Sequence, residues 1–530
     1  MVDLTLIVET VEHLPQEILQ EVLVEHLLQV HLQEVQVKHL HQEVHQGHHL
    51  QAEVPLVEVR HLKEEIKKII MKKLLVLVIL FATTTISFAQ SLGYQDLGIL
   101  FSQDDNVGSA RFTAMSGTFG ALGGDISSLN INPAGLSVFT NSSFSGTFNS
   151  RNSQITTDYY GNSLMDNNQF INLSQAGAIL VFRENNDSGW NKFAVGFNYR
   201  LTKDFTENFS ARGNSGVATF TEFPLDTNDP KLNYDIADEQ VFENSYGGEL
   251  SEFNIGFSSV HEERLHVGLG LNFYDLNFIQ KSTLVEFNSD ANGNELDAYL
   301  YQENLTSGEG FSASLGFIYK ANKYFRFGLS YQTPTWFSEI IEESNILDNE
   351  GYYGDTEIFI SNDSVIYDNT SGGYFPSQAL VYRLRTPSKL IASGAVIFGK
   401  SGLLSFDYTN KNFKNIRLSG DDFSLENKYF QDDYRNTHNL NVGAEWRIER
   451  LSVRGGYRFE QSPDINALET DDLKGYSLGA GYNFGNFKVD LSYSDSNRTA
   501  AYNFYSGFNV DAANLALNNK IFTTSVSLSL

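Results

Sequence analysis

The chain has 530 residues and a formal net charge of −28, which argues against a nucleic-acid partner. It contains no cysteine, which excludes a disulfide framework, a thiol nucleophile and a cysteine-ligated metal. Aromatic residues make up 13% of the chain, with 40 Phe and 26 Tyr, which is more than we expect of a soluble domain.

Residues 1–70 recycle Val, Leu, His, Gln and Glu and hold nine of the twelve histidines. Residues 71–89, which begin MKKLLVLVIL, have the basic start, apolar middle and small-residue end of a secretory signal peptide. One interpretation of 1–70 is a His-rich metal-binding arm. We favour the other, a spurious or disordered extension ahead of a true start at Met71, because a signal peptide begins a protein. We therefore predict no metal site and no cofactor.

Residues 90–140 precede the first clear strand and contain the stretch LGGDISSLNINPAGLSVF (122–139). Its glycines and its proline disfavour both a long helix and a central strand. It is nevertheless too apolar for a solvated loop. A compact, irregular, semi-apolar segment of this kind predicts a plug that fills the lumen of a barrel.

Residues 141–530 are a succession of segments with period-two alternation, which indicates strands with one apolar and one polar face. Typical examples are NKFAVGFNYRL (191–201), LNVGAEWRI (440–448) and LSVRGGYRF (451–459). We count about fourteen strands, centred near residues 146, 177, 197, 256, 271, 315, 330, 392, 406, 444, 456, 480, 491 and 525. Long acidic connections are expected at 206–250, 285–308, 340–378 and 410–436.

Two architectures use such strands: a soluble sandwich and an outer-membrane barrel. Three features favour the barrel, namely polar faces rich in Gly, Ser and Asn, aromatic residues at strand ends, and short turns that alternate with long polar loops. No apolar run of about 18 residues follows residue 89, so no transmembrane helix is expected there. The predicted fold is all-β, a transmembrane antiparallel β-barrel of about 14 strands with an N-terminal plug.

The stretch ALGGDISSLNINPAGLSVF resembles the N-terminal hatch of the FadL family, the outer-membrane transporters of long-chain fatty acids and other hydrophobic compounds. The matching motif is Asn132, Pro133, Ala134 and Gly135, and GLSYQTPTWF (328–337) and RLRTPSKL (383–390) also look like family segments. The resemblance implies a hatch-plugged barrel that binds hydrophobic ligands inside, and a kink in one strand associated with lateral release. We expect that kink near Gly196, on the third strand.

Alternation places a set of ionisable side chains on the polar, lumen-facing side. They are Arg200, Arg326, Arg383, Arg385, Asp407, Glu445, Arg447, Arg454, Arg458 and Asp490. Arginine presents a bidentate fork to a carboxylate, so Arg454, Arg458 and Arg447 are candidates to hold a ligand head group. The alternative is a structural network of paired lumenal charges. Tyr94, Leu97 and Phe101 near the mature N-terminus are candidates for apolar contact with the ligand.

Enzymatic activity is not expected. Only His261, His266 and His438 follow residue 89, and none stands beside a Gly-x-Ser-x-Gly elbow. The sequence thus predicts a monomeric channel in the bacterial outer membrane. It would pass hydrophobic small molecules, foremost long-chain fatty acids, by hatch-gated diffusion. The alternative is a general porin or surface-binding barrel without fatty-acid specificity.

Overall fold

The computed structural model describes residues 92–184, 189–223, 226–345, 356–360, 363–367, 380–505 and 508–530. The predicted extension (1–70) and signal peptide (71–89) lie outside the described residues, as do two residues at the start of the predicted plug (90–140). Within the described part, no helix is both long enough and apolar enough to cross a membrane.

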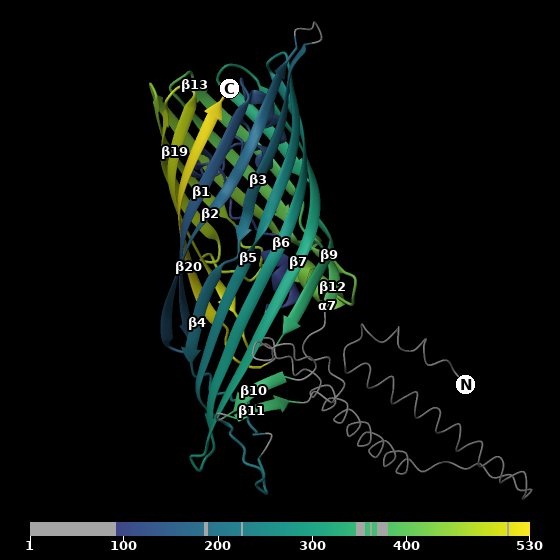
Figure 1. The fold of residues 1–530 in the computed structure, drawn as a ribbon, viewed down its shortest axis with the longest axis vertical. Coiled ribbons are helices and arrows are strands. Elements are labelled where there is room, and N and C mark those ends of the chain that lie inside the picture. Colours follow the sequence, from purple (N-terminus) through teal and green to yellow (C-terminus); the bar gives the residue numbers. More distant parts are fainter. Residues whose placement is uncertain are drawn as a thin grey trace, which may run out of the picture. The chain divides into compact units, whose positions relative to one another are not determined.

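One antiparallel sheet closes on itself as a barrel of 14 strands, which confirms the predicted fold class and strand number (Figure 1). Closure comes from β1, which pairs with β2 on one side and with the last strand, β20, on the other. The 14 strands are β1 (Ser143–Tyr159), β2 (Asn162–Arg183), β3 (Trp190–Asp204), β5 (Ile236–His261), β6 (Leu265–Ser289), β7 (Glu295–Lys320), β8 (Phe325–Gln332), β13 (Lys389–Phe398), β14 (Gly402–Asn412), β16 (Asn436–Ile448), β17 (Leu451–Glu460), β18 (Leu473–Asn483), β19 (Phe487–Tyr502) and β20 (Ala513–Ser529).

At the end of the barrel opposite the short turns, further strands lengthen the wall. They are β4 (Glu207–Gly213), β9 (Trp336–Asn345), β12 (Leu380–Arg385) and β15 (Arg417–Ser419), with the hairpin β10 (Thr356–Ile360) and β11 (Asp363–Tyr367) beside β7. Figure 1 shows this end below and the C-terminal end of β20 above. We call the lower end the loop end and the upper end the turn end.

Two of the predicted long connections are wrong. Residues 285–308 are not a loop, because β6 and β7 continue to a tight turn at 290–294. Residues 206–250 contain β4 and the first half of β5. The strand residues of both segments pair with their neighbours in the sheet. Residues 340–378 lie partly outside the described residues, and 410–436 include η2 (Phe413–Asn415), β15 and α7 (Ser424–Asp432).

The side chains around the turn-end half of the wall decide between barrel and sandwich. On β3 the apolar Phe193 and Phe197 are exposed, while Asn198 and Arg200, which occupy the alternate positions of the same strand, are buried. The same holds on β16, where Trp446 is exposed and Glu445 is buried. An apolar outside and a polar inside are typical of an outer-membrane barrel and the reverse of a soluble core.

At the loop end this polarity is inverted. On β12 the inward residues are Tyr382 and Leu384, whereas Arg383 and Arg385 are exposed on the outside, so their predicted lumenal position is wrong. Beyond the membrane the outer face meets water, and the lumen there is filled by aromatic clusters, one of them around Phe242. The alternation continues through the strand, but the solvent on each side has changed.

The N-terminal segment (92–141) lies inside the barrel and forms four short helical turns. They are α4 (Tyr94–Leu100), α5 (Ala110–Ala114), α6 (Ser128–Ile131) and the 3₁₀ turn η1 (Pro133–Val138). Ser109 caps α5 by accepting a hydrogen bond from Phe112 N. Gly123 and Gly124 adopt φ of +63° and +67°, a conformation that favours glycine, and so let the chain reverse between α5 and α6.

Candidate functional site: the N-terminal segment and the cavity beside it

Asn132 joins the N-terminal segment to the wall. Its side-chain amide donates to Gly120 O at 2.7 Å and to Phe317 O of β7 at 3.0 Å. Its Oδ1 accepts from Ala134 N at 3.1 Å, which caps η1 with Pro133 in the first turn. Both polar atoms of this fully buried side chain are thus engaged, and two of its three hydrogen bonds are to the backbone of the segment itself.

Glycines on consecutive strands make the inner wall flat where η1 and α6 lie against it. A Cβ atom at Gly268 of β6 would stand 2.3 Å from Ala134 N, and one at Gly316 of β7 would stand 2.0 Å from Asn132 Oδ1. Gly196, Gly256 and Gly328 are in the same situation against Leu136, Leu129 and Gly120 O, respectively. The predicted motif Asn132–Gly135 therefore lies in a groove lined by strand glycines, where a Cβ atom at Gly268 or Gly316 would collide with it.

Gly196 is part of this groove, and the backbone irregularities of β3 lie on either side of it. The register of β3 against β5 shifts between Trp190 and Lys192 and again between Leu201 and Lys203. The strand ends at Asp204, one residue after Lys203. The expected kink is not at Gly196.

An ion network, buried except for Arg447, lies on the other side of the segment. Glu445 accepts from Arg111 of α5 at 2.8 Å and from Arg454 of β17 at 2.6 Å. Arg454 also pairs with Asp490 at 2.7 Å, and Arg447 pairs with Glu445. Arg454 and Arg447 therefore belong to a network of paired charges, which was the alternative to ligand binding. Neither residue lines the cavity described next.

The cavity, of about 880 Å³, lies at the loop end of the N-terminal segment, between that segment and the wall. Its apolar lining comes from Ile99 and Leu100 of α4 and from side chains of the wall such as Phe209, Tyr246 and Leu515. The remainder of the lining is polar and charged. The cavity can therefore hold a molecule with an apolar body and a polar end.

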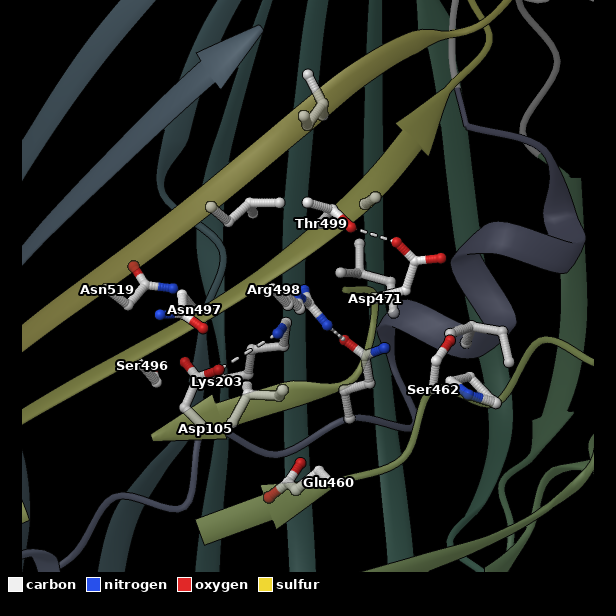
Figure 2. A pocket seen from close by; sticks show the side chains of 18 of the residues that line it. Asp105, Lys203, Glu460, Ser462, Asp471, Ser496, Asn497, Arg498, Thr499 and Asn519 are labelled. Atoms are coloured by element: carbon white, nitrogen blue, oxygen red, sulfur yellow. Dashed lines mark hydrogen bonds and ion pairs between the residues drawn. The ribbon is translucent and has the colours of Figure 1, made fainter. Parts of the chain in front are cut away.

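Most charges in this cavity are already paired. Asp105, in the connection between α4 and α5, binds Lys203 at 3.3 Å, and Arg151 approaches it at 3.9 Å (Figure 2). Arg458 donates to Asp105 O at 3.1 Å and pairs with Glu460 at 3.2 Å. Of the three predicted arginines, Arg458 alone lines the cavity.

Arg498 of β19 is different, because within the described residues it forms no ion pair. Its guanidinium, half-buried at the cavity wall, donates to the neutral Oε1 of Gln103 at 3.5 Å (Figure 2). Sequence reasoning missed this residue. The signal was available, since the alternation that places Asp490 inward puts every second residue of β19 inward as far as Arg498.

The three residues near the mature N-terminus that were predicted to contact the ligand do not face the cavity. Leu97 and Phe101 are buried with Phe205 and Phe278 in the loop-end aromatic cluster. Tyr94 packs edge-on against Tyr382 and Phe423 and donates to Glu342 at 3.2 Å. None of these three residues lines the cavity; their neighbours Ile99 and Leu100 do.

One Ser–His contact bears on the enzyme alternative. Nδ1 of His266 lies 2.8 Å from Oγ of Ser137, and Ser258 donates to the same hydroxyl. All three side chains are buried between η1 and the wall. The contact holds the segment in place, as the neighbouring hydrogen bonds do.

A closed antiparallel barrel with an apolar outer face, a polar inner face and a segment packed inside defines an outer-membrane β-barrel protein. No protein-family model matches the chain, and no curated protein matches it either. Among solved structures, a FadL homologue of Pseudomonas aeruginosa is similar, with a TM-score of 0.50 and 15% identity, over 81% of this chain and 99% of that one. The chain therefore has the fold of the FadL family, as its residues predicted.

Two further structures are similar at lower scores. The monoaromatic hydrocarbon channel CymD has a TM-score of 0.47 and 14% identity, over 81% of this chain and 99% of that chain. The toluene transporter TodX of Pseudomonas putida has a TM-score of 0.46 and 14% identity, over 81% of this chain and 100% of that chain.

Proposed function

We propose that this protein passes hydrophobic small molecules with an acidic head group, foremost long-chain fatty acids, across the outer membrane. Passage is by diffusion, without bond chemistry, and the N-terminal segment acts as the hatch. One chain is sufficient, because the barrel closes on itself. Transfer of the apolar body from water into the cavity drives binding, at roughly 0.8 kcal/mol per buried methylene.

The observation that carries this proposal is the composition of the cavity wall. Apolar side chains cover one part of it, and Arg498 presents a guanidinium without a carboxylate partner among the described residues on another. A plain hydrocarbon leaves that guanidinium unused, whereas the carboxylate of a fatty acid pairs with it. The similar structure is named a FadL homologue, and FadL is the family that the motif Asn132–Gly135 resembles.

The test is uptake of a labelled long-chain fatty acid by a bacterium that lacks its own transporter and expresses this chain from Met71. We expect uptake with the intact chain and markedly less with Arg498→Gln. Toluene uptake, measured in parallel, should not respond to Arg498→Gln. If the barrel reaches the outer membrane and toluene enters but the fatty acid does not, the head-group part of the proposal is wrong. If neither compound enters, the proposal as a whole is wrong.

A second strain carries Asn132, Pro133 and Ala134 replaced together. If the N-terminal segment is a hatch, this strain should either lose fatty-acid uptake or admit small polar solutes that the intact chain excludes. Unchanged uptake without leakage would show that the segment does not gate the barrel.

A further inference from the structure

Asp104 lies where three basic side chains of the wall converge. Lys389 of β13 and Lys411 of β14 are directly opposite each other in the sheet, and both pair with the Asp104 carboxylate. The distance from Lys411 Nζ to Oδ2 is 3.5 Å. Arg200 of β3 approaches the other oxygen, with Nη2 4.0 Å from Oδ1. One carboxylate thus bridges the lumen between β3 and the β13–β14 pair.

Among the three cations, Lys389 and Lys411 depend on Asp104 for neutralisation of their charge. Arg200 has a second partner, Glu252, at 2.6 Å. Within the described residues, neither Lys389 nor Lys411 forms an ion pair with any other carboxylate. Like charges directly opposite on neighbouring strands destabilise a sheet unless an anion lies between them. Burial alone would raise the pKa of Asp104, but Lys389, Lys411 and Arg200 lower it well below its ordinary value.

The anion and the cations belong to different parts of the fold. The three cations are on strands of the wall, held by the sheet. Asp104 is in the irregular connection of residues 102–109, between α4 and α5, and it lines the cavity together with Lys411. A shift of this connection alone would remove the carboxylate and leave both lysines without their anion, with Lys411 at the cavity wall.

We propose that Lys389, Lys411 and Arg200 form a carboxylate-binding site of the lumen, which Asp104 occupies while the cavity is empty. The carboxylate of a ligand that has first paired with Arg498 at the cavity wall then takes the place of Asp104 by exchange of ion pairs, and residues 102–109 are released from the wall. The exchange step rests on the proposed function. The site itself does not.

The site is tested by chemical rescue of the full barrel, purified from the membrane. Asp104→Ala removes the anion and leaves space for a small carboxylate, so we expect a lowered midpoint of thermal unfolding that formate restores. Formamide and chloride at equal concentration should not restore it. Rescue should vanish in D104A/K411M and persist in D104A/K414M, because Lys414 is an exposed lysine that contacts Gln431 O instead. Equal rescue by formate in both double variants, or no rescue by formate in D104A, would show that the proposed carboxylate site does not exist. If D104A does not assemble, the same formate titration is done on Asp104→Ser, whose short side chain also leaves space for formate.

Exchange is tested with dodecanoate and its neutral counterpart dodecanol. Asp104→Asn removes the internal competitor, so dodecanoate should bind about tenfold more tightly than to the unaltered chain, while dodecanol affinity stays the same. The gain should be lost in D104N/K411M. An equal gain for both compounds, or for neither, overturns the exchange. If neither compound binds any variant, the proposed function fails, and formate rescue still decides whether the carboxylate site exists.

Discussion

A Cβ atom on Gly316 would stand 2.0 Å from Oδ1 of Asn132. There is therefore no space for a further side-chain atom where the wall and the N-terminal segment meet. Asn132 cannot move aside, because its amide is hydrogen-bonded to Gly120 O and Phe317 O. The position of the segment in the barrel is therefore set jointly by a strand glycine and a buried amide that are far apart in the sequence.

Gly316→Ala should push the segment away from β7. We expect a loss of about 1–3 kcal/mol in the free energy of unfolding, the usual cost of overpacking a tight core. Permeability to small polar solutes should also rise. Denaturant unfolding in lipid vesicles and a solute-swelling assay measure the two effects. Gly394→Ala is the matched control, since a Cβ atom at that strand glycine meets nothing within 4 Å. Equal effects of both substitutions would contradict the steric argument.

Asn132→Asp should destabilise the contact between the N-terminal segment and β7, although the Asn and Asp side chains have the same shape. The substitution replaces an NH₂ group that donates to two carbonyl oxygens by an oxygen that faces them. We expect the free energy of unfolding to fall by about 1–3 kcal/mol. Asn130→Asp introduces the same charge two residues away, on a half-buried side chain without that pair of carbonyls, and should cost less. Denaturant unfolding of both variants measures the two losses of free energy. A larger loss in Asn130→Asp than in Asn132→Asp would refute the prediction.

Arg454 and Arg458 should respond differently to truncation. Arg454→Met leaves Glu445 and Asp490 buried without their shared partner, so the free energy of unfolding should fall by about 3–5 kcal/mol while ligand affinity is unchanged. Arg458→Met alters the cavity wall and should weaken carboxylate binding with a smaller loss of stability. Unfolding and dodecanoate titrations on both variants separate the roles. Weakened binding in Arg454→Met with stability intact would restore the sequence-based prediction for Arg454.

Stability should depend on pH through Glu342. This residue lies on β9 beyond Trp336, where the exposed aromatic row of the outer face ends, and burial raises the pKa of its carboxyl to about 7. The unfolded chain releases this proton near pH 4.5, whereas the folded chain keeps it up to about pH 7. Stability should therefore fall between these values, by about 3 kcal/mol, and level off above them.

Glu342→Gln should remove this slope. The exposed neighbour Glu343→Gln should leave it in place. The midpoint of thermal unfolding, followed from pH 4 to pH 8 on the three proteins, gives the result. A slope that survives in Glu342→Gln would assign the pH dependence to another group.

The sequence by itself determined the barrel. Period-two alternation is local, so the strands around Phe197, Leu271 and Trp446 could be counted and their faces assigned from neighbouring residues alone. Its resemblance to the FadL hatch also singled out Asn132–Gly135. The loop end was mispredicted, since the same alternation persists there while the medium outside changes from lipid to water.

Only the tertiary structure decided which charges meet. Arg454 and Arg458 are on the same face of one strand, yet the first is buried against Glu445 and the second lines the cavity. Asp104 pairs with Lys389 and Lys411, which are 285 and 307 positions away in the sequence, because closure of the barrel brings β13 and β14 to the path of the N-terminal segment. Ion pairs depend on distance in space, and strand periodicity specifies only which face of the wall a side chain occupies.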